Sequence, residues 1–407
     1  MTATQLSPRD HFISRTDQVL QHLHDTGQFK DLQMIEGPMG PTITLREYGE
    51  VSCFCSNNYL GLANHPDVVE AGIEGLREYG AGTASVRFIC GTFVPHETLE
   101  RTIATFLGVE AAYTFVSCWN ASEALFPTVC EPGDIIISDE LNHACIIDSM
   151  RLTSQIKKGT HRGVYKHSDM ESLRATLEKA QANEDVTGAI WVITDGVFSM
   201  EGDIAHMAEL RALCDEFGAM LVVDDSHGTG VLGATGRGTH EHCGLAGADV
   251  DVFTGTLGKA LGGGAGGYIA GSKRLIDLIV QRARPTLFSN ALPVTVACSA
   301  NKAIEVLMRE PERVARLQDN ATYARSSIRN AGFEVLESPT AICPIIVGDT
   351  AKAIAMSKEL LGMGAFAIGF GYPVVPEGTA RVRVQISAAH EREQIDHLAA
   401  SLKRLRD

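Results

Sequence analysis

Short apolar runs alternate with helix-like segments through the middle of the chain. Each run is five or six residues long, and together they occupy residues 111–116, 134–138, 189–194, 219–224 and 251–256. Segments such as 66–80 and 96–108 carry apolar residues at the spacing of an amphipathic helix. Apolar runs separated by helices indicate buried parallel strands, because helices then cover both faces of the sheet. The pattern therefore predicts an α/β protein with a large, mostly parallel sheet.

The two ends of the chain have a different pattern. Residues 10–30 have helix-like spacing of apolar residues, and glycine and proline at 37–41 mark a turn. From about residue 291, long helical stretches precede strand-like runs at 343–348 and 381–387. We expect an N-terminal arm and small-domain segment, a large domain that binds any cofactor, and a smaller C-terminal α+β domain, over residues 1–55, 56–290 and 291–407.

The charge balance excludes several classes of partner. The chain has 35 Lys and Arg against 50 Asp and Glu, a formal net charge of −15, so it has no overall basic field to recruit nucleic acid or an anionic membrane. No apolar run reaches the roughly 18 residues of a membrane span. The N-terminus also lacks the basic start and apolar stretch of a secretion signal, so we expect a cytoplasmic location.

The cysteines do not indicate a metal site. The nearest pair, Cys53 and Cys55, has a single residue between its members, whereas zinc knuckles have two or more. We expect buried reduced thiols and predict no metal.

The apolar run at 219–224 ends in a cluster of polar residues, Asp224, Asp225 and His227. Ligands of open α/β sheets bind at the carboxyl ends of the strands, so this place favours chemistry. Adjacent strand residues point to opposite faces, so only one of the two acids need enter a site. A solvated turn is the alternative.

The same stretch has the glycine spacing G-x-G-x-x-G, at Gly228, Gly230 and Gly233. The dinucleotide-binding fingerprint requires these glycines to open a helix directly after a strand. Here DDSH intervenes, and the residues that follow have no apolar helical face. The spacing therefore does not favour a nicotinamide-dependent oxidoreductase.

Lys259 lies in a glycine-rich stretch of small residues, 251–271. A phosphate-binding P-loop would require glycine at 253 and serine or threonine at 260, where this chain has Phe253 and Ala260. A flat cofactor could approach such a backbone closely, and a lysine beside apolar surfaces can lose its proton near neutral pH and act as a nucleophile. The alternative is a solvated lysine in a flexible loop.

Segment 114–126 passes from a strand-like run through small and polar residues into a helix-like pattern. Backbone N–H groups at such a helix start bind phosphate, although Ser117 or Asn120 could simply cap the helix. A phosphate site, an acid at a strand end and a lysine after a later strand are the parts that pyridoxal phosphate requires. Together they predict a pyridoxal-phosphate-dependent enzyme.

Seven stretches of the chain also resemble a known family. They are residues 56–66, 84–92, 141–148, 194–203, 223–230, 254–263 and 383–390. They resemble the α-oxoamine synthases, enzymes of the fold-type I, aminotransferase-like fold that condense an amino acid with an acyl-CoA. The resemblance runs in order from the N-terminal arm to the last helix. Within the family, 84–92 and 371–390 are similar to the branch that joins glycine to acetyl-CoA.

The resemblance implies roles in cofactor binding. Four catalytic residues are implied. Lys259 would be the Schiff-base lysine, and Asp224 would pair with the pyridine nitrogen. His227 would pair with the phenolic oxygen, and His143 would stack on the ring. Further cofactor contacts are implied at Ser117, Cys118 and Trp119, which would hold the phosphate, and at Thr256 and Ser199.

The resemblance also implies substrate contacts and a partner. Arg383 would pair with the substrate carboxylate through its planar fork, and Asn57 would lie beside it. Ser289 would reach the phosphate of the other subunit. A homodimer with shared active sites follows from this role.

The chain departs from the glycine-acetylating branch at three places. Residues 117–124 read SCWNASEA, which places Trp119, Asn120 and Glu123 at the edge of the cofactor. Gly371 stands where a bulky aromatic residue is expected, and 223–230 is closer to 8-amino-7-oxononanoate synthase. We expect the small residue at 371 to open the substrate pocket to a longer acyl chain or a larger amino acid.

The predicted reaction is the condensation of glycine with acetyl-CoA, which gives 2-amino-3-oxobutyrate and CoA. One alternative is a larger amino acid or longer acyl-CoA, as in 8-amino-7-oxononanoate synthase or serine palmitoyltransferase. The other is a non-catalytic family member, but the presence of Lys259, Asp224 and His143 argues against it.

Overall fold

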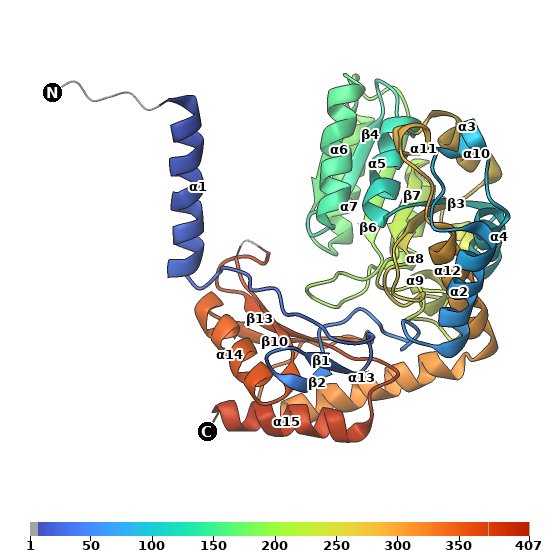
Figure 1. Ribbon diagram of the computed structural model, residues 1–407. Helices are drawn as coiled ribbons and strands as arrows, with labels where there is room; N and C mark the ends of the chain where they lie inside the picture. The colour runs from blue at the N-terminus through green and yellow to red at the C-terminus, as the bar shows by residue number, and fades with distance from the viewer. Residues whose placement is uncertain (1–6, 373, 407) are drawn as a thin grey trace.

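The five apolar runs form strands of one seven-stranded sheet. The structure, a computed structural model, describes residues 7–372 and 374–406 (Figure 1). The strand order is β3-β9-β8-β7-β6-β4-β5. The bounds are β3 (Ala111–Phe115), β4 (Ile135–Asp139), β5 (His161–Tyr165), β6 (Ile190–Asp195), β7 (Met220–Asp224), β8 (Val252–Thr256) and β9 (Gly267–Gly271).

The sheet is mostly parallel, as the sequence predicts. Strand β4 pairs in parallel with β5 and β6, and β6, β7 and β8 continue the parallel order. Strand β9 runs antiparallel to β3 and β8. Successive residues of β7 enter two separate cores, Val222 on one face and Leu221 and Val223 on the other. The fold-type I architecture is therefore confirmed.

Helices cover both faces of this sheet. The longer ones are α2 (Pro66–Tyr79), α4 (Val94–Leu107), α5 (Cys118–Val129), α6 (Ala144–Ile156), α7 (Met170–Gln181), α8 (Met207–Phe217), α10 (Lys273–Arg282) and α12 (Val294–Arg309). Short helices are α3 (Arg87–Cys90), α9 (Thr239–His242), α11 (Arg284–Phe288) and the 3-10 turn Gly247–Asp249. Helix α12, which the sequence assigned to the C-terminal part, packs against α2 and α4.

Two small sheets form the rest of the body. One contains β1 (Thr42–Leu45), β2 (Gly49–Cys53) and β11 (Ala365–Phe366), and the other contains β10 (Ile342–Gly348), β12 (Ile368–Phe370) and β13 (Ala380–Gln385). Helices α13 (Glu312–Asn330), α14 (Thr350–Gly362) and α15 (Arg392–Arg406) lie beside them (Figure 1). The expected smaller α+β domain is thus present, while the boundaries at 55 and 290 stay predictions.

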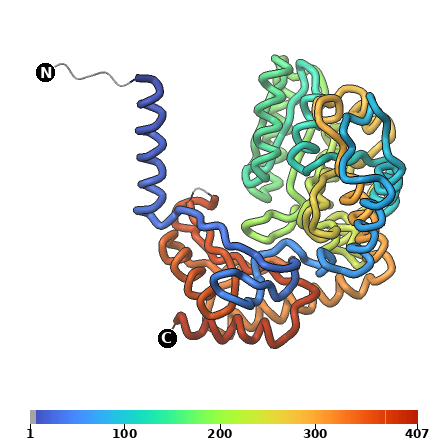
Figure 2. Tube along the Cα trace, in the orientation of Figure 1, coloured from blue at the N-terminus to red at the C-terminus, as the bar shows by residue number. Residues whose placement is uncertain are grey.

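Helix α1 (Pro8–Asp25) stands apart from the body (Figure 2). Ser7 caps it by accepting a hydrogen bond from the backbone N–H of Asp10, yet none of its residues is buried. In the part of the chain that the structure describes, no helix is long and apolar enough to cross a membrane.

Gly371 does not open a substrate pocket, contrary to the expectation from the sequence. It follows β12, and a Cβ atom at this position would lie 2.3 Å from Thr350 Cγ2 and 2.4 Å from Thr350 Oγ1. Thr350, the first residue of α14, therefore occupies the space that a side chain at position 371 would need. The glycine is there because strand end and helix start pack too closely for a larger residue.

A short ion-pair network holds the loop after β6 against the sheet. His167 Nδ1 lies 3.0 Å from Asp139 Oδ1, and His167 Nε2 lies 2.8 Å from Asp203 Oδ2. Burial alone would lower the pKa of His167, but the hydrogen bonds to the two carboxylates raise it to about 10. The imidazolium therefore joins the end of β4 to residue 203, near the predicted site residue Ser199.

Gly371→Ala should lower the melting temperature, because the new methyl group overpacks against Thr350. Overpacking of this kind costs about 1–3 kcal/mol. Gly362→Ala in α14 is the matched control, since apart from its chain neighbours and the backbone of its own helix no atom lies within 4 Å of its Cβ position. Equal melting temperatures for Gly371→Ala and the wild type would contradict the packing described for residue 371.

The stabilising effect of His167 should depend on pH. Its folded-state pKa is raised above the ordinary 6.5, so its contribution is complete below pH 6.5 and is lost as the pH rises through about 10. We expect His167→Gln to be less stable than the wild type by about 1.5–3 kcal/mol near pH 6, the usual range for hydrogen bonds to charged groups. Denaturant unfolding at pH 6 and pH 10 measures the difference in unfolding free energy between the variant and the wild type. A difference that does not become smaller at pH 10 contradicts the network.

Candidate active site

A cavity of about 210 Å³ lies where β6, β7 and β8 end. We call it the cofactor cavity. Parallel strands bring their carboxyl ends to one edge of a sheet, which is why residues far apart in the sequence meet there. The lining residues are Cys118, Trp119, His143, Cys145, Asp195, Val197, Ser199, Asp224, Ser226, His227, Thr256 and Lys259.

Lys259 follows β8 and directs its amine into this cavity. Its Nζ lies 2.9 Å from His227 Nε2. Burial lowers the pKa of Lys259, although the nearby Asp224 carboxylate acts in the opposite direction. The lowered pKa increases the fraction of neutral amine, which is the nucleophilic form.

His227 connects the lysine to a buried polar chain. Its Nδ1 lies 2.9 Å from the Tyr59 hydroxyl, which lies 2.9 Å from the Gln385 amide. The Gln385 amide also lies 2.6 Å from Asn57 Oδ1. Burial lowers the pKa of His227 well below its usual value, so the neutral ring offers one donor and one acceptor.

Arg383 lies at the far side of this chain, on β13. It is 7% exposed, and its Nε finds no acceptor among residues 7–372 and 374–406. A buried guanidinium N–H without an acceptor is costly, so this group is suited to an anionic ligand. Arg383 and Asn57 do not line the cofactor cavity themselves, but Gln385 and Tyr59 place both close to it.

The two adjacent acids at the end of β7 have different surroundings. Asp224 lines the cavity, and its Oδ2 accepts a hydrogen bond from Thr254 at 3.0 Å. Asp225 points the other way, where Thr229 and Thr239 donate hydrogen bonds to it. Burial raises the pKa of Asp225 to about 7. Asp224 is thus the acid that faces the cavity.

Helix α5 begins at the cavity wall. Ser117 caps it by accepting a hydrogen bond from Asn120 N–H at 3.2 Å. The amides of Cys118 and Trp119, in the first turn, have no intrahelical acceptor and can bind an anion. A Cβ at Gly267 of β9 would lie 2.4 Å from Cys118 N, so only glycine lets the strand approach this helix start.

His143 forms another wall of the cavity at the start of α6. Its backbone N–H donates to Asp195 Oδ2 at 3.0 Å, and its Nδ1 lies 3.0 Å from Cys145 Sγ. The Trp119 ring meets the His143 ring edge to face, with the centroids 6.3 Å apart. Burial lowers the pKa of His143, which favours the neutral imidazole.

The residues of the cavity fit pyridoxal phosphate. A buried amine can bind the aldehyde, a carboxylate can pair with the pyridine nitrogen, and free amides at a helix start can hold the phosphate. Thr256 and Ser199 also line the cavity, as expected, although the Thr256 hydroxyl already accepts from Gly258 N–H at 3.0 Å.

The structure does not bring Ser289 to the cofactor cavity of its own chain. Ser289 instead ends α11 and lines a separate small groove with Asn120. Conversely, the cavity contains Asp195, which the sequence reading missed. Asp195 ends the apolar run of β6, in register with Asp224 on β7, and that position at a strand end could have identified it.

Comparisons with known proteins agree with this geometry. The family described as aminotransferase class I and II matches residues 50–402. The chain is 44% identical to the mitochondrial 2-amino-3-ketobutyrate coenzyme A ligase of Homo sapiens over 93% of this chain and 88% of that protein. It is 42% identical to the ligase of Escherichia coli (strain K12) over 98% of each chain.

Solved structures show the same fold. A structure of SPT with a PLP internal aldimine has a TM-score of 0.89 at 29% identity, over 96% of this chain and 97% of the other. Sphingomonas wittichii serine palmitoyltransferase has a TM-score of 0.87 at 28% identity, over 99% and 98%. The chain is therefore an enzyme that belongs to the class I and II aminotransferase family and, within it, to the pyridoxal-phosphate-dependent α-oxoamine synthases.

Proposed function

We propose that this protein condenses glycine with the acetyl group of acetyl-CoA, releasing CoA and giving 2-amino-3-oxobutyrate. The observation that carries the proposal is the buried Lys259 amine, whose pKa burial lowers, in one cavity with Asp224. The Nε of Arg383, on β13 of the small sheet, lacks an acceptor and is suited to a substrate carboxylate. The names of the relatives at 42% and 44% identity support the same reaction.

The proposed mechanism assigns the proton transfer to Lys259. Pyridoxal phosphate, when bound, supplies an electron-accepting ring that stabilises the carbanion formed when the amino acid loses its α-proton. The neutral Lys259 amine takes that proton, and His227, 2.9 Å away, orients the amine. Asp224 would pair with the ring nitrogen of the bound cofactor and keep that nitrogen protonated.

Arg383 and Asn57 orient the amino acid in this proposal. The guanidinium forms a bidentate pair with the substrate carboxylate, which satisfies its unpartnered Nε. The buried Tyr59 and Gln385 fix Asn57 beside that carboxylate. The carboxylate is thereby anchored on the small sheet while the reacting carbon faces Lys259 on the large one.

A neutral histidine assists the thioester. As charge builds on the thioester oxygen, an N–H aimed at it stabilises the transition state. Both His143 and His227 face the cavity, and burial favours the neutral form of each. His143 has its Nε2 free of the contacts that its Nδ1 makes with Cys145, so we assign the donor to His143.

We also propose a homodimer with shared sites. Ser289 lies outside the cavity of its own chain, which is consistent with the role inferred from the family resemblance, a contact to the phosphate in a second copy. A cytoplasmic location stays a prediction, because the names of several relatives include "mitochondrial".

A CoA-release assay over a matrix of amino acids and acyl-CoAs tests the function. We expect the highest turnover with glycine and acetyl-CoA, and loss of turnover in Lys259→Ala, which retains no amine to move the proton. Borohydride should fix the cofactor to Lys259 in the wild type, as a mass increase on the peptide that contains it. Higher turnover with serine or with a long acyl-CoA would assign the enzyme to another branch, and full turnover of Lys259→Ala would contradict the mechanism.

Asp224→Asn should reduce kcat by about 10²–10⁴-fold, because the neutral amide no longer holds the ring nitrogen protonated. Asp225→Asn is the matched control, since Asp225 is equally buried but faces Thr229 and Thr239. We expect its effect mainly on the melting temperature. Larger rate loss in Asp225→Asn than in Asp224→Asn would transfer the role to the other face of the strand.

A further inference from the structure

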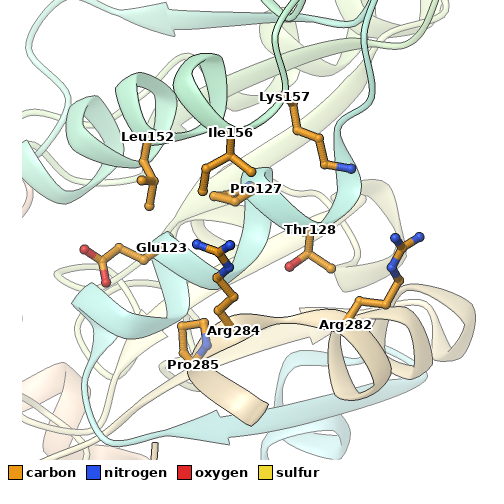
Figure 3. Close-up of a pocket in the computed structure, with 9 residues that line it drawn as sticks. All are labelled: Glu123, Pro127, Thr128, Leu152, Ile156, Lys157, Arg282, Arg284 and Pro285. Carbon is orange, nitrogen blue, oxygen red and sulfur yellow. The ribbon is translucent and has the colours of Figure 1, made fainter. Parts of the chain in front are cut away.

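Two thiols lie side by side outside the cofactor cavity. Cys53 ends β2 and Cys55 follows it after one residue, with the two Sγ atoms 3.9 Å apart. By contrast, the cavity in Figure 3 has the charged side chains of Lys157, Arg282 and Arg284, and none of its lining residues carries a thiol. We call Cys53 and Cys55 the thiol pair.

Backbone hydrogen bonds fix the first member of the thiol pair. Cys53 N–H donates to Pro41 O at 2.8 Å, and the His390 ring donates to Cys53 O at 3.0 Å. The intervening Phe54 N–H donates to a carbonyl of β11 at 2.8 Å. Cys55 lies in the bend that follows. A movement of the two sulfurs toward each other is therefore taken up on the Cys55 side.

A hydrogen bond within the thiol pair makes Cys53 the more acidic thiol. The Cys55 S–H lowers the pKa of Cys53 to about 7, although burial acts in the opposite direction. The same hydrogen bond, together with burial, raises the pKa of Cys55 well above its ordinary value. The thiolate is the form of cysteine that reacts with oxidants. Near neutral pH the pair thus contains one nucleophilic sulfur, on Cys53, beside one protonated sulfur.

The thiol pair adjoins the residues that are proposed to bind the substrate carboxylate. The charge of Arg383 acts on the Cys55 thiol, and Asn57, two residues after Cys55, has its Oδ1 2.6 Å from the Gln385 amide. Two steps along an extended chain span about 6.6 Å, within the roughly 4.4–6.8 Å between Cα atoms that a disulfide can bridge. A disulfide would bring the sulfurs to about 2.0 Å, and the shift of Cys55 would move the segment that carries Asn57.

We propose that the thiol pair is a redox modification site, where a peroxide forms a disulfide that displaces Asn57 and weakens the binding of the amino acid. Cys53 is 3% exposed, so the oxidant has to be as small as hydrogen peroxide. The effect on the amino acid rests on the proposed condensation and on the role of Asn57 in it.

The modification takes two steps and needs hydrogen peroxide as its only co-reactant. The Cys53 thiolate attacks a peroxide oxygen, so that an S–O bond forms, the O–O bond breaks and hydroxide leaves. The Cys55 sulfur then attacks Cys53, the S–S bond forms, and the S–O oxygen leaves as water with the Cys55 proton. The hydroxide takes up the proton that Cys53 had given to the solvent. The two thiols are thereby oxidised to one disulfide, and the peroxide is reduced to two waters.

Peptide masses after trypsin digestion test the modification. Cys53 and Cys55 are the only cysteines of the tryptic peptide 47–77. After hydrogen peroxide treatment of the holoenzyme, this peptide should lose two hydrogens and resist alkylation, and dithiothreitol should restore two thiols that can be alkylated. The exposed Cys90, in another peptide, serves as the control that the peroxide has reacted. Two free thiols in peptide 47–77, or added oxygen on either sulfur, alongside oxidised Cys90 would overturn the proposal.

Glycine binding to the holoenzyme tests the consequence without turnover, through the change in cofactor absorbance. Peroxide should raise the Kd of the wild type for glycine by about 10-fold or more, the usual worth of a hydrogen bond to a charged group, and dithiothreitol should reverse the rise. Cys53→Ser, which cannot form the disulfide, should keep its Kd after the same treatment. An unchanged Kd in wild type that contains the disulfide, or an equal rise in Cys53→Ser, would overturn the proposal.

Failure of the proposed function would give a different result. An untreated holoenzyme that binds no glycine and releases no CoA from acetyl-CoA would contradict the condensation. The mass of peptide 47–77 would still decide whether the disulfide forms, because that measurement needs neither substrate.

Discussion

The contact between Lys259 and His227 is the constraint on which the site depends. A lysine amine buried without a carboxylate in direct contact is unfavourable as a cation, so the fold has to supply a neutral partner. His227 meets this requirement because its own burial lowers its pKa. It can do so only while Tyr59 satisfies its second nitrogen. The polarity of the cavity is therefore set by groups outside the cavity.

This dependence joins the two parts of the body. Tyr59 precedes α2, and Gln385 and Arg383 belong to β13 of a small sheet, whereas Lys259 and His227 follow strands of the large sheet. The polar chain between them crosses from one sheet to the other. Backbone bonds reinforce the crossing, since Ala388 N–H donates to Tyr59 O at 2.7 Å. A displacement of the small sheet would consequently reach the lysine through its partners.

The strands and site residues that could be predicted from the sequence are those marked by the residues next to them in the chain. The parallel strands are themselves apolar runs, and the acid that ends β7, the histidine that follows it and the lysine after β8 stand directly behind such runs, so the carboxyl edge of the sheet could be predicted. Strand β9 was not predicted, because its glycines are needed for the approach to Cys118 and hide the strand pattern. Gly371 was misread for a related reason: its small size reflects Thr350, a neighbour 21 residues earlier that no local pattern reveals.

The register of β6 and β7 has an electrostatic consequence. It places Asp195 directly opposite Asp224, so two carboxyl groups share one cavity. Burial, and then the charge of Asp224, raise the pKa of Asp195 well above its ordinary value. The shift is toward the protonated form of Asp195, which lowers the negative charge of this part of the cavity. An anion such as a phosphate ester meets a correspondingly weaker repulsion there, so a single-residue alignment between two strands helps to set the affinity of the cavity for its charged ligand.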